Sequence, residues 1–408
     1  MTAPRPVEQA GVELVGYHDL DGNAGFKMAM QEVGGRWFLY LGHFSRGGWS
    51  VVDVTDPTRP ERLHFIPGPS GTWASQVQVA DGLMLGALEK PHALLSSIYP
   101  EGPYEEGVLI WDVRDDPARP RLLAHHRTGG TGTHRNFWAG GRYAYLAAGP
   151  AGYRGLILSV IDLRDPSLPV EVARWSWPGQ HEAAGETPEH SFYFHGPAYV
   201  AGELAYLSYG RVGMVVLDVA DPTRPRMIGR LDLGDLGSSL GCHTALPLPR
   251  RNLVVVNSEA IIEGYGDALN YVFLADVADP AAPRVVSALP MPHPRSDLPY
   301  RNYYEKGGRF GPHNQHHFQG QPALADLDRT VVLTYFNAGL RIYDIDDEYA
   351  PREVGCFVPE DPTERLTPMP TQRLVTQFED VLVDRRGYIF CTDKNYGLFV
   401  LRFDGDLR

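Results

Sequence analysis

The chain has 408 residues, of which 43% are hydrophobic and 21% charged, and its 44 Gly and 34 Pro are typical of many short strands and turns rather than of disorder. Its 37 basic and 50 acidic residues give a formal net charge of −13, which opposes non-specific binding to nucleic acid or to an anionic membrane surface. No long apolar stretch or basic leader is evident, and three scattered cysteines are too few for a disulfide framework, so we expect a cytoplasmic protein.

A short phrase recurs six times along the chain. Each copy is a β-branched apolar run followed by Asp and a Pro-punctuated turn, and the copies begin at Val51, Ile110, Val160, Val216, Leu274 and Ile342. The phrase predicts a strand that ends in a tight connection to another strand. The Asp residues are spaced by about 50 to 68 positions, which is the length of a four-stranded propeller blade with variable loops.

A seventh copy lies at residues 396–403, where the strand is present but the turn is missing. The N-terminal segment 12–17 has the style of the strands that follow each turn, such as residues 226–231. We expect this segment to complete the last blade and close the ring, because closure removes exposed sheet edges. The sequence therefore predicts an all-β fold, a seven-bladed β-propeller, as a single domain over residues 1–408.

Histidines interrupt the repeat at one structural position. Eleven residues before equivalent points in the second strands of blades three, four and five stand His134, His195 and His243. Each would begin the innermost strand of its blade, so the three imidazoles should converge near the ring axis. A single histidine of this kind could instead satisfy backbone groups, but several in register favour a metal site with nitrogen ligands.

Blade six offers several candidates for a fourth ligand. His317 fits the spacing best, and His316, His313 and Gln315 are alternatives because a longer loop blurs the count. Blade seven places Glu379 at the equivalent position, as a metal ligand, a partner that orients an imidazole, or a catalytic base. The set suits a divalent transition metal, with Fe(II) favoured and Mn, Zn or Cu as alternatives.

Four long insertions occur at connections that share one end of a propeller: residues 90–106, 178–194, 292–312 and 359–375. Long loops on a rigid scaffold are commonly where substrate binds. We therefore expect them to roof the histidine end and to cover a small-molecule substrate.

Five residues are candidates for contacting that substrate. Arg301, Tyr303 and Tyr304 lie in the third insertion, Arg135 follows a predicted ligand, and Lys394 lies in the last blade. They would suit an anionic or carbonyl group. The alternative is that the third insertion is an ordinary surface loop whose tyrosines pack on the lid, and that Arg135 and Lys394 pair with the abundant Asp residues.

The repeated phrase resembles that of the LVIVD-repeat proteins, with the DPxxP turn at Asp56, Asp116, Asp221 and Asp279. The resemblance covers nearly the whole chain and implies a β-propeller, but it implies little about a reaction. The histidine pattern is similar to those of metal-bearing propellers of three kinds. Carotenoid-cleavage oxygenases hold Fe(II) with four His, oligogalacturonate lyases bind a divalent metal through His and Gln, and selenium-binding proteins, including methanethiol oxidase, have a His-rich centre.

Open coordination positions decide between the possible chemistries. Four neutral His leave up to two positions on octahedral Fe(II), whereas three His and an oxygen ligand around Mn or Zn suit Lewis-acid catalysis. We predict a metalloenzyme, preferably a non-haem oxidoreductase or oxygenase, with a lyase or hydrolase acting on a carboxylate or carbonyl compound as the alternative. A third hypothesis is a non-enzymatic propeller scaffold that binds a protein across its loop face.

Overall fold

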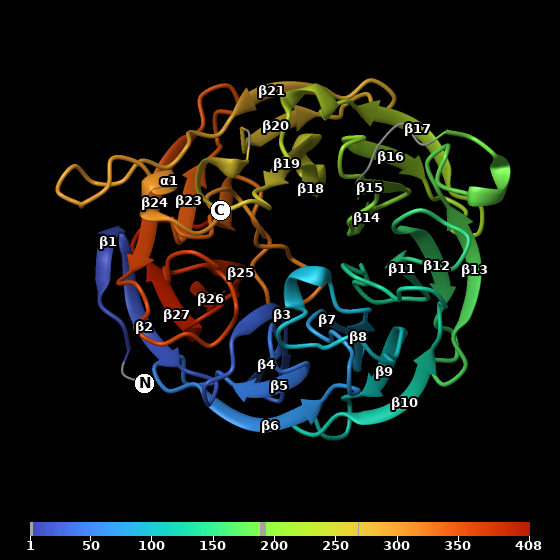
Figure 1. Ribbon diagram of the computed structural model, residues 1–408, viewed down its shortest axis with the longest axis horizontal. Coiled ribbons are helices and arrows are strands. Elements are labelled where there is room, and N and C mark those ends of the chain that lie inside the picture. The colour runs from blue at the N-terminus through green and yellow to red at the C-terminus, as the bar shows by residue number, and fades with distance from the viewer. Residues whose placement is uncertain (1–2, 188–192, 268) are drawn as a thin grey trace.

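Seven antiparallel sheets surround a central axis in the computed structural model, which describes residues 3–187, 193–267 and 269–408 (Figure 1). Within these residues the protein is an all-β propeller, as the repeats predict. The first five blades run outward from the axis in chain order. Blades one and two consist of β3 (Gly25–Val33), β4 (Arg36–His43), β5 (Gly48–Asp53) and β6 (Glu61–Pro67), then β7 (Val77–Ala80), β8 (Leu83–Leu88), β9 (Gly107–Asp112) and β10 (Arg121–His126).

Blade three has a less regular inner edge than its neighbours. Residues 133 and 137 contact β11 only through isolated bridges, so its regular strands are three: β11 (Tyr143–Ala148), β12 (Ile157–Asp162) and β13 (Val170–Trp175). Blades four and five consist of β14 (Ala198–Ala201), β15 (Leu204–Ser208), β16 (Met214–Asp218) and β17 (Arg226–Leu231), then β18 (Leu240–Leu248), β19 (Leu253–Glu259), β20 (Val272–Asp276) and β21 (Arg284–Ala288).

The N-terminal segment closes the ring as predicted. Blade seven contains β25 (Phe378–Val383), β26 (Tyr388–Asp393), β27 (Gly397–Phe403) and β2 (Val12–His18), with β2 antiparallel to β27 from Val12↔Phe403 to His18↔Leu398. Blade six contains β22 (Thr330–Thr334), β23 (Leu340–Asp344), β24 (Arg352–Pro359) and β1 (Pro6–Ala10). The pairing of β1 with β24 is a second N-terminal contact, beyond the one expected from the sequence.

Buried polar contacts join the two ends of the ring. Asp380 of β25 accepts hydrogen bonds from Lys27 Nζ at 2.8 Å and from the backbone N–H of Met28 at 2.7 Å, both on β3. The Thr392 hydroxyl on β26 donates to the carbonyl oxygen of Phe26 at 2.7 Å. Because a buried carboxylate is costly without such partners, these contacts hold blade seven in register with blade one.

The repeated phrase has a local physical cause. In each copy the Asp that ends the third strand accepts a hydrogen bond from the backbone N–H two residues ahead, for example Asp218 from Ala220 at 3.0 Å. The Asp of the DPxxP turn makes the same kind of hydrogen bond, as Asp221 accepts from the backbone N–H of Thr223 at 3.0 Å. The phrase therefore specifies the tight turn between the third and fourth strands.

The apolar runs of the phrase pack between blades. Val160 of β12 and Val215 of β16 are fully buried in one cluster shared by blades three and four. Outer strands are more exposed, as in β17, where only two of six residues are buried. The core is thus a series of wedges between neighbouring sheets, which leaves the axial ends free to carry functional side chains.

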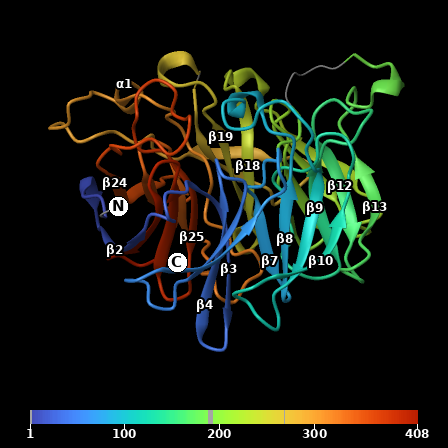
Figure 2. The same cartoon turned by 60° about the horizontal axis from the view of Figure 1, so that its bottom comes forward.

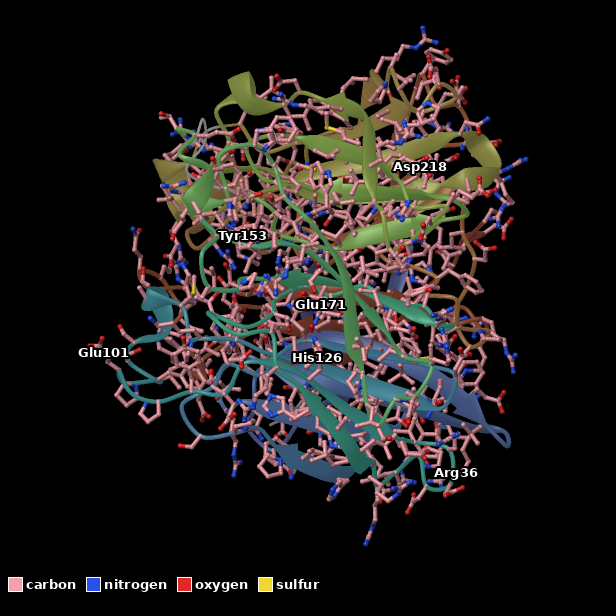
Figure 3. The ribbon with its side chains drawn as sticks, turned by 90° about the vertical axis from the view of Figure 1, so that its right-hand side faces the viewer. Arg36, Glu101, His126, Tyr153, Glu171 and Asp218 are labelled. Atoms are coloured by element: carbon pink, nitrogen blue, oxygen red, sulfur yellow. The ribbon has the colours of Figure 1, made fainter. Side chains whose placement is uncertain are left out.

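The insertions gather on one face of the ring. Figure 2 shows α1 and the short helical turns of the long connections on its upper side. In the side view of Figure 3, Glu101 and Tyr153 lie toward this face, whereas Arg36 and Asp218, at the strand turns, lie toward the other. The helices are η1 (Ala93–Leu95), η2 (Glu182–Ala184), η3 (Gly234–Leu236), η4 (Pro249–Arg251), η5 (Gly264–Gly266) and α1 (Tyr303–Lys306). None of the helices within the described ranges is long and apolar enough to cross a membrane.

The turn aspartates make stability sensitive to acid. Hydrogen bonds from their own turns lower the pKa of Asp218, Asp276 and Asp344 from the ordinary value. Their contribution is fully present above the unfolded-state pKa of about 3.9 and is lost as pH falls through the lower folded-state pKa. We expect the melting temperature, followed by circular dichroism, to drop as pH falls from 4 toward 2.

The matched control is the triple variant Asp218→Asn, Asp276→Asn, Asp344→Asn, whose amide oxygens can still accept the turn hydrogen bonds but carry no charge. It should lose less stability over this pH range than the unmodified protein. An equal loss in both proteins would contradict the assignment to these carboxylates.

Candidate metal centre

Four histidines from four successive blades form a row at the insertion end of the ring. They are His134, His195, His243 and His313, and all four line one cavity. The centroids of neighbouring rings lie 4.8, 5.0 and 4.7 Å apart in that order. The structure therefore brings together three of the four predicted ligands, with His313 as the fourth member of the row.

The backbone explains why these side chains share one level. The N–H groups of His134, His195 and His313 donate, at 2.9, 3.0 and 2.9 Å, to the carbonyl of the fifth residue of the adjacent second strand. The same register in three blades places each imidazole at the same distance along the axis, because strand geometry fixes side-chain position.

The structure corrects the choice of His317 for this position. The histidine N–H and the carbonyl that accepts from it are 13 residues apart in blades three and four but 21 apart in blade six. A fixed count back from the second strand therefore stops at a residue after His313. His317 lies elsewhere, with its ring centroid 5.6 Å from Phe137 and 4.7 Å from Tyr199.

The other two alternatives in blade six join neighbouring blades. His316 Nε2 donates to the Ala325 carbonyl at 2.8 Å, and its Nδ1 accepts from the Val383 N–H at 3.0 Å. Gln315 Nε2 donates to Asn257 Oδ1 at 2.6 Å. These side chains satisfy buried polar groups of the scaffold, and their ring or amide nitrogens are not directed to the histidine row.

Partners of Nδ1 orient two of the row's imidazoles. His313 Nδ1 lies 2.6 Å from the carbonyl oxygen of Glu379. A carbonyl only accepts, so Nδ1 carries the proton and Nε2 carries the lone pair. His134 Nδ1 is 2.7 Å from Glu89 Oε2, a contact of the kind that fixes metal-ligating histidines.

Nε2 of His243 has no hydrogen-bond partner within the described part of the chain, although it is buried. It lies 3.5 Å from Glu259 Oε2, and the nitrogen of His195 lies 3.9 Å from the same oxygen. Burial holds the pKa of His195, His243 and His313 well below the usual range, so all three are neutral and can donate a lone pair.

His195, His243 and Glu259 form a group whose ligand atoms all lie within 4.8 Å of one another and which could hold a metal ion. Glu259 ends β19, and its Oε1 is also 3.7 Å from His313 Nε2. Arg309 Nη1 donates to this carboxylate at 2.8 Å, which balances its charge.

Glu259 and Glu89 are not among the residues predicted from the sequence, although the repeats contain a signal for them. In each blade, one residue of the second strand pairs with the repeat Asp: Leu253 with Asp276 in blade five and Leu83 with Asp112 in blade two. Glu259 and Glu89 stand six residues after these leucines. Aligning the ends of the second strands as well as the histidines would have found both carboxylates.

Glu379 and Lys394 form a fully buried ion pair behind His313, with Lys394 Nζ 2.6 Å from Glu379 Oε1. Burial raises the pKa of Glu379 and lowers the pKa of Lys394 to about 8, and the attraction between them opposes both shifts. Glu379 Oε2 is also 3.5 Å from His313 Nδ1. Lys394 thus neutralises this carboxylate, which differs from the substrate contact that the sequence predicts for it.

Arg135 links neighbouring blades as an internal strut, through hydrogen bonds of its buried guanidinium. Its guanidinium is buried and donates to the Gly196 carbonyl at 2.8 Å and to Asn314 Oδ1 at 2.9 Å, and it also reaches the His243 carbonyl. These contacts tie blades three to six together beneath the histidines. Its donors therefore serve the scaffold, although part of the side chain lines the cavity.

The three candidate substrate contacts of the third insertion do not line the cavity. Arg301 is 89% exposed and pairs with Glu305, and Tyr304 packs its ring on Tyr265 with centroids 5.2 Å apart. The fully buried Tyr303 donates its hydroxyl to Glu8 of β1 at 2.9 Å. These side chains pack the loop, as the alternative interpretation supposed.

The cavity has a volume of about 310 Å³. All four insertions reach it, with Leu95, Phe194, Arg309 and Met369 as one lining residue from each. This bears out the expected roof over the histidine end, except for residues 188–192, which lie outside the described part of the chain. Pockets of this size bind small organic molecules.

Comparisons with known proteins support the repeat and the fold. The LVIVD repeat model matches residues 131–176 and 198–232, so blades three and four contain LVIVD repeats. No protein with a curated description matches the sequence significantly. Among solved structures, a crystal structure of the computationally designed Ika8 protein is similar, with a TM-score of 0.50 and 10% identity over 96% of this chain and 99% of that chain. This likeness shows the fold alone.

Arg135 and Arg301 are both substrate-contact candidates in the sequence, but their substitution should affect stability differently. Arg135→Leu removes several buried hydrogen bonds and leaves carbonyls unpaired, so we expect the free energy of unfolding to fall by about 3 kcal/mol. Arg301→Leu should leave it unchanged within error. Urea denaturation followed by fluorescence measures both, and equal effects of the two changes would contradict the strut assignment.

Proposed function

We propose that this protein is a metal-dependent enzyme that holds one divalent transition metal beside the histidine row and acts on a small organic substrate in the adjoining cavity. Fe(II) and non-haem oxidoreductase chemistry are favoured. The observation that carries the proposal is the row of imidazoles on four blades, with a buried Nε2 of His243 that no described group satisfies.

The spacing of the row supports the fit. Two imidazoles that bind one ion through nitrogen–metal bonds of about 2.1 Å have centroids roughly 4.5 to 5 Å apart. The observed separations between neighbours, 4.8, 5.0 and 4.7 Å, agree with this range, and the ligand atoms of His195, His243 and Glu259 lie within 4.8 Å of one another. Glu89, the Glu379 carbonyl and Thr244, whose hydroxyl lies 2.9 Å from His243 Nδ1, would fix the ring orientations.

The buried charges near the row nearly cancel. The carboxylates of Glu259 and Glu379 face the cations of Arg309 and Lys394, so a divalent ion would depend on its own ligands, Glu259 among them, for charge compensation. When bound, such a metal supplies open coordination positions for an oxidant or a substrate oxygen. The residues themselves would position the substrate, exclude water with the roof loops and hold the carboxylate charges in place.

A lyase or hydrolase is the second candidate, and Glu259 favours it. A carboxylate close to His195, His243 and His313 could complete a ligand set of three His and one oxygen, which Zn or Mn prefers and which suits Lewis-acid catalysis on a carbonyl or carboxylate.

Metal analysis by mass spectrometry of the purified protein tests the proposal. We expect about one equivalent of metal, iron in the favoured case, and its loss from His195→Ala and His243→Ala. His313→Ala should lose metal as well, whereas the matched variant His317→Ala, whose ring lies outside the row, should retain it if folded by circular dichroism.

Glu259→Gln separates the two candidate chemistries. Retention of iron by this variant would favour a histidine-only site and redox chemistry, and loss of zinc or manganese from it would favour the Lewis-acid enzyme. Absence of stoichiometric metal after reconstitution with each ion would contradict the metalloenzyme and leave a scaffold that binds a partner across its loop face.

A further inference from the structure

Three aromatic side chains line the cavity beside the histidines. Phe26 and Phe44 of blade one and Trp73 of blade two all line it, with centroid separations of 5.4, 5.8 and 5.9 Å among the three rings. We propose that this aromatic wall is the substrate subsite and that it takes an uncharged small molecule with a planar aromatic or conjugated ring. The inference rests on the proposed function only for the reaction, not for binding.

The position of the wall supports the proposal. Trp73 stacks on His134 with centroids 5.5 Å apart, and Phe26 lies 6.3 Å from His313, so the wall begins where the two ends of the histidine row stop. Blades one and two thus supply aromatic rings at the level where blades three to six supply imidazoles. A ligand on the wall is therefore a direct neighbour of the histidines.

The electrostatics disfavour a cationic ligand. Lys394 Nζ already lies 4.8 Å from the centroid of Phe44, where it uses the electron-rich face of that ring. Arg309 also lines the cavity. Because Lys394 already occupies the face of Phe44, a quaternary ammonium or a protonated amine could not use that face, so the wall does not act as an ammonium cage.

The electrostatics also give an anion no committed partner. Arg309 donates to Glu259 at 2.8 Å, and Lys394 lies 2.6 Å from Glu379. Both cations are therefore already balanced, so an anionic ligand would add an uncompensated charge to this buried site, which is costly. An uncharged ring gains contact with the wall without disturbing either pair, and offset or edge-to-face ring contacts add to the hydrophobic gain.

The size of the cavity limits the ligand. A closed apolar cavity of about 150 Å³ accommodates benzene. The present cavity of about 310 Å³ is roughly twice as large, and the apolar side chains of Leu95 and Met369 cluster with the wall. One ring with a substituent, or two fused rings with a small polar group, therefore fits the space.

Isothermal titration calorimetry with 2-naphthol tests the wall in both metal-free and zinc-loaded protein. Phe26→Leu removes a ring at nearly constant size and should weaken binding roughly tenfold. Leu95→Trp fills the cavity and should abolish binding. Phe65→Leu, which removes a ring from the outer strand β6 of the same blade, is the matched control and should bind like the unmodified protein.

Phenyltrimethylammonium, an aromatic cation, should bind at least tenfold more weakly than 2-naphthol. The proposal is overturned if the unmodified protein does not bind 2-naphthol, if neither cavity variant weakens binding, or if the cation binds as tightly. The titration of metal-free protein does not depend on the metal site. If the protein takes up one equivalent of metal but does not bind 2-naphthol, the aromatic subsite is contradicted and the metal site stands. If it binds 2-naphthol but takes up no metal, the metal site is contradicted and the aromatic subsite stands.

Discussion

The hydrogen-bond register between the first and second strands of a blade is the constraint on which the site depends. In blades three, four and six it sets one imidazole at the insertion end of the axis, as the matching contacts of His134, His195 and His313 show. His243 joins the row from an irregularity in the pairing of β18 with β19. Closure by β2 and the buried Asp380 contacts hold blade seven against blade one, so the circle of positions is complete. A propeller without this register would still bury its wedges of apolar side chains, but its histidines would not meet.

That circle is divided into two chemically different arcs. Imidazoles occupy the arc of blades three to six, with carboxylates behind or beside them, and aromatic rings occupy the arc of blades one and two. Burial keeps the imidazoles of His195, His243 and His313 neutral, and the pairs Glu259–Arg309 and Glu379–Lys394 cancel most of the remaining charge. The result is a small cavity with a polar side suited to an ion and an apolar side suited to a ring. The proposed metalloenzyme would need both sides, one for the metal and one for an organic substrate.

The local repeats predicted the blades, the ring closure and three histidines, because Asp-capped turns and apolar alternation are encoded within ten residues. The prediction of His317 was wrong because the connection between the first and second strands of blade six has eight more residues than in blades three and four. No repeat encodes this length, so a fixed spacing gives the wrong residue. Arg301, Tyr303 and Tyr304 lie in an insertion without periodicity, so the directions of their side chains depend on tertiary packing. Glu89 and Glu259 could have been found, since they share one position in two blades.

The most direct test of the account is a crystal structure of the metal-reconstituted protein with anomalous diffraction recorded at the absorption edge of the bound metal. We predict one anomalous peak in the cavity, about 2.1 Å from Nε2 of His195 and His243, with His313 and His134 turned toward it. A map without a peak among these nitrogens at full metal loading, or with the peak on the opposite face near His317, would contradict the central claim that the register of the inner strands builds a metal site.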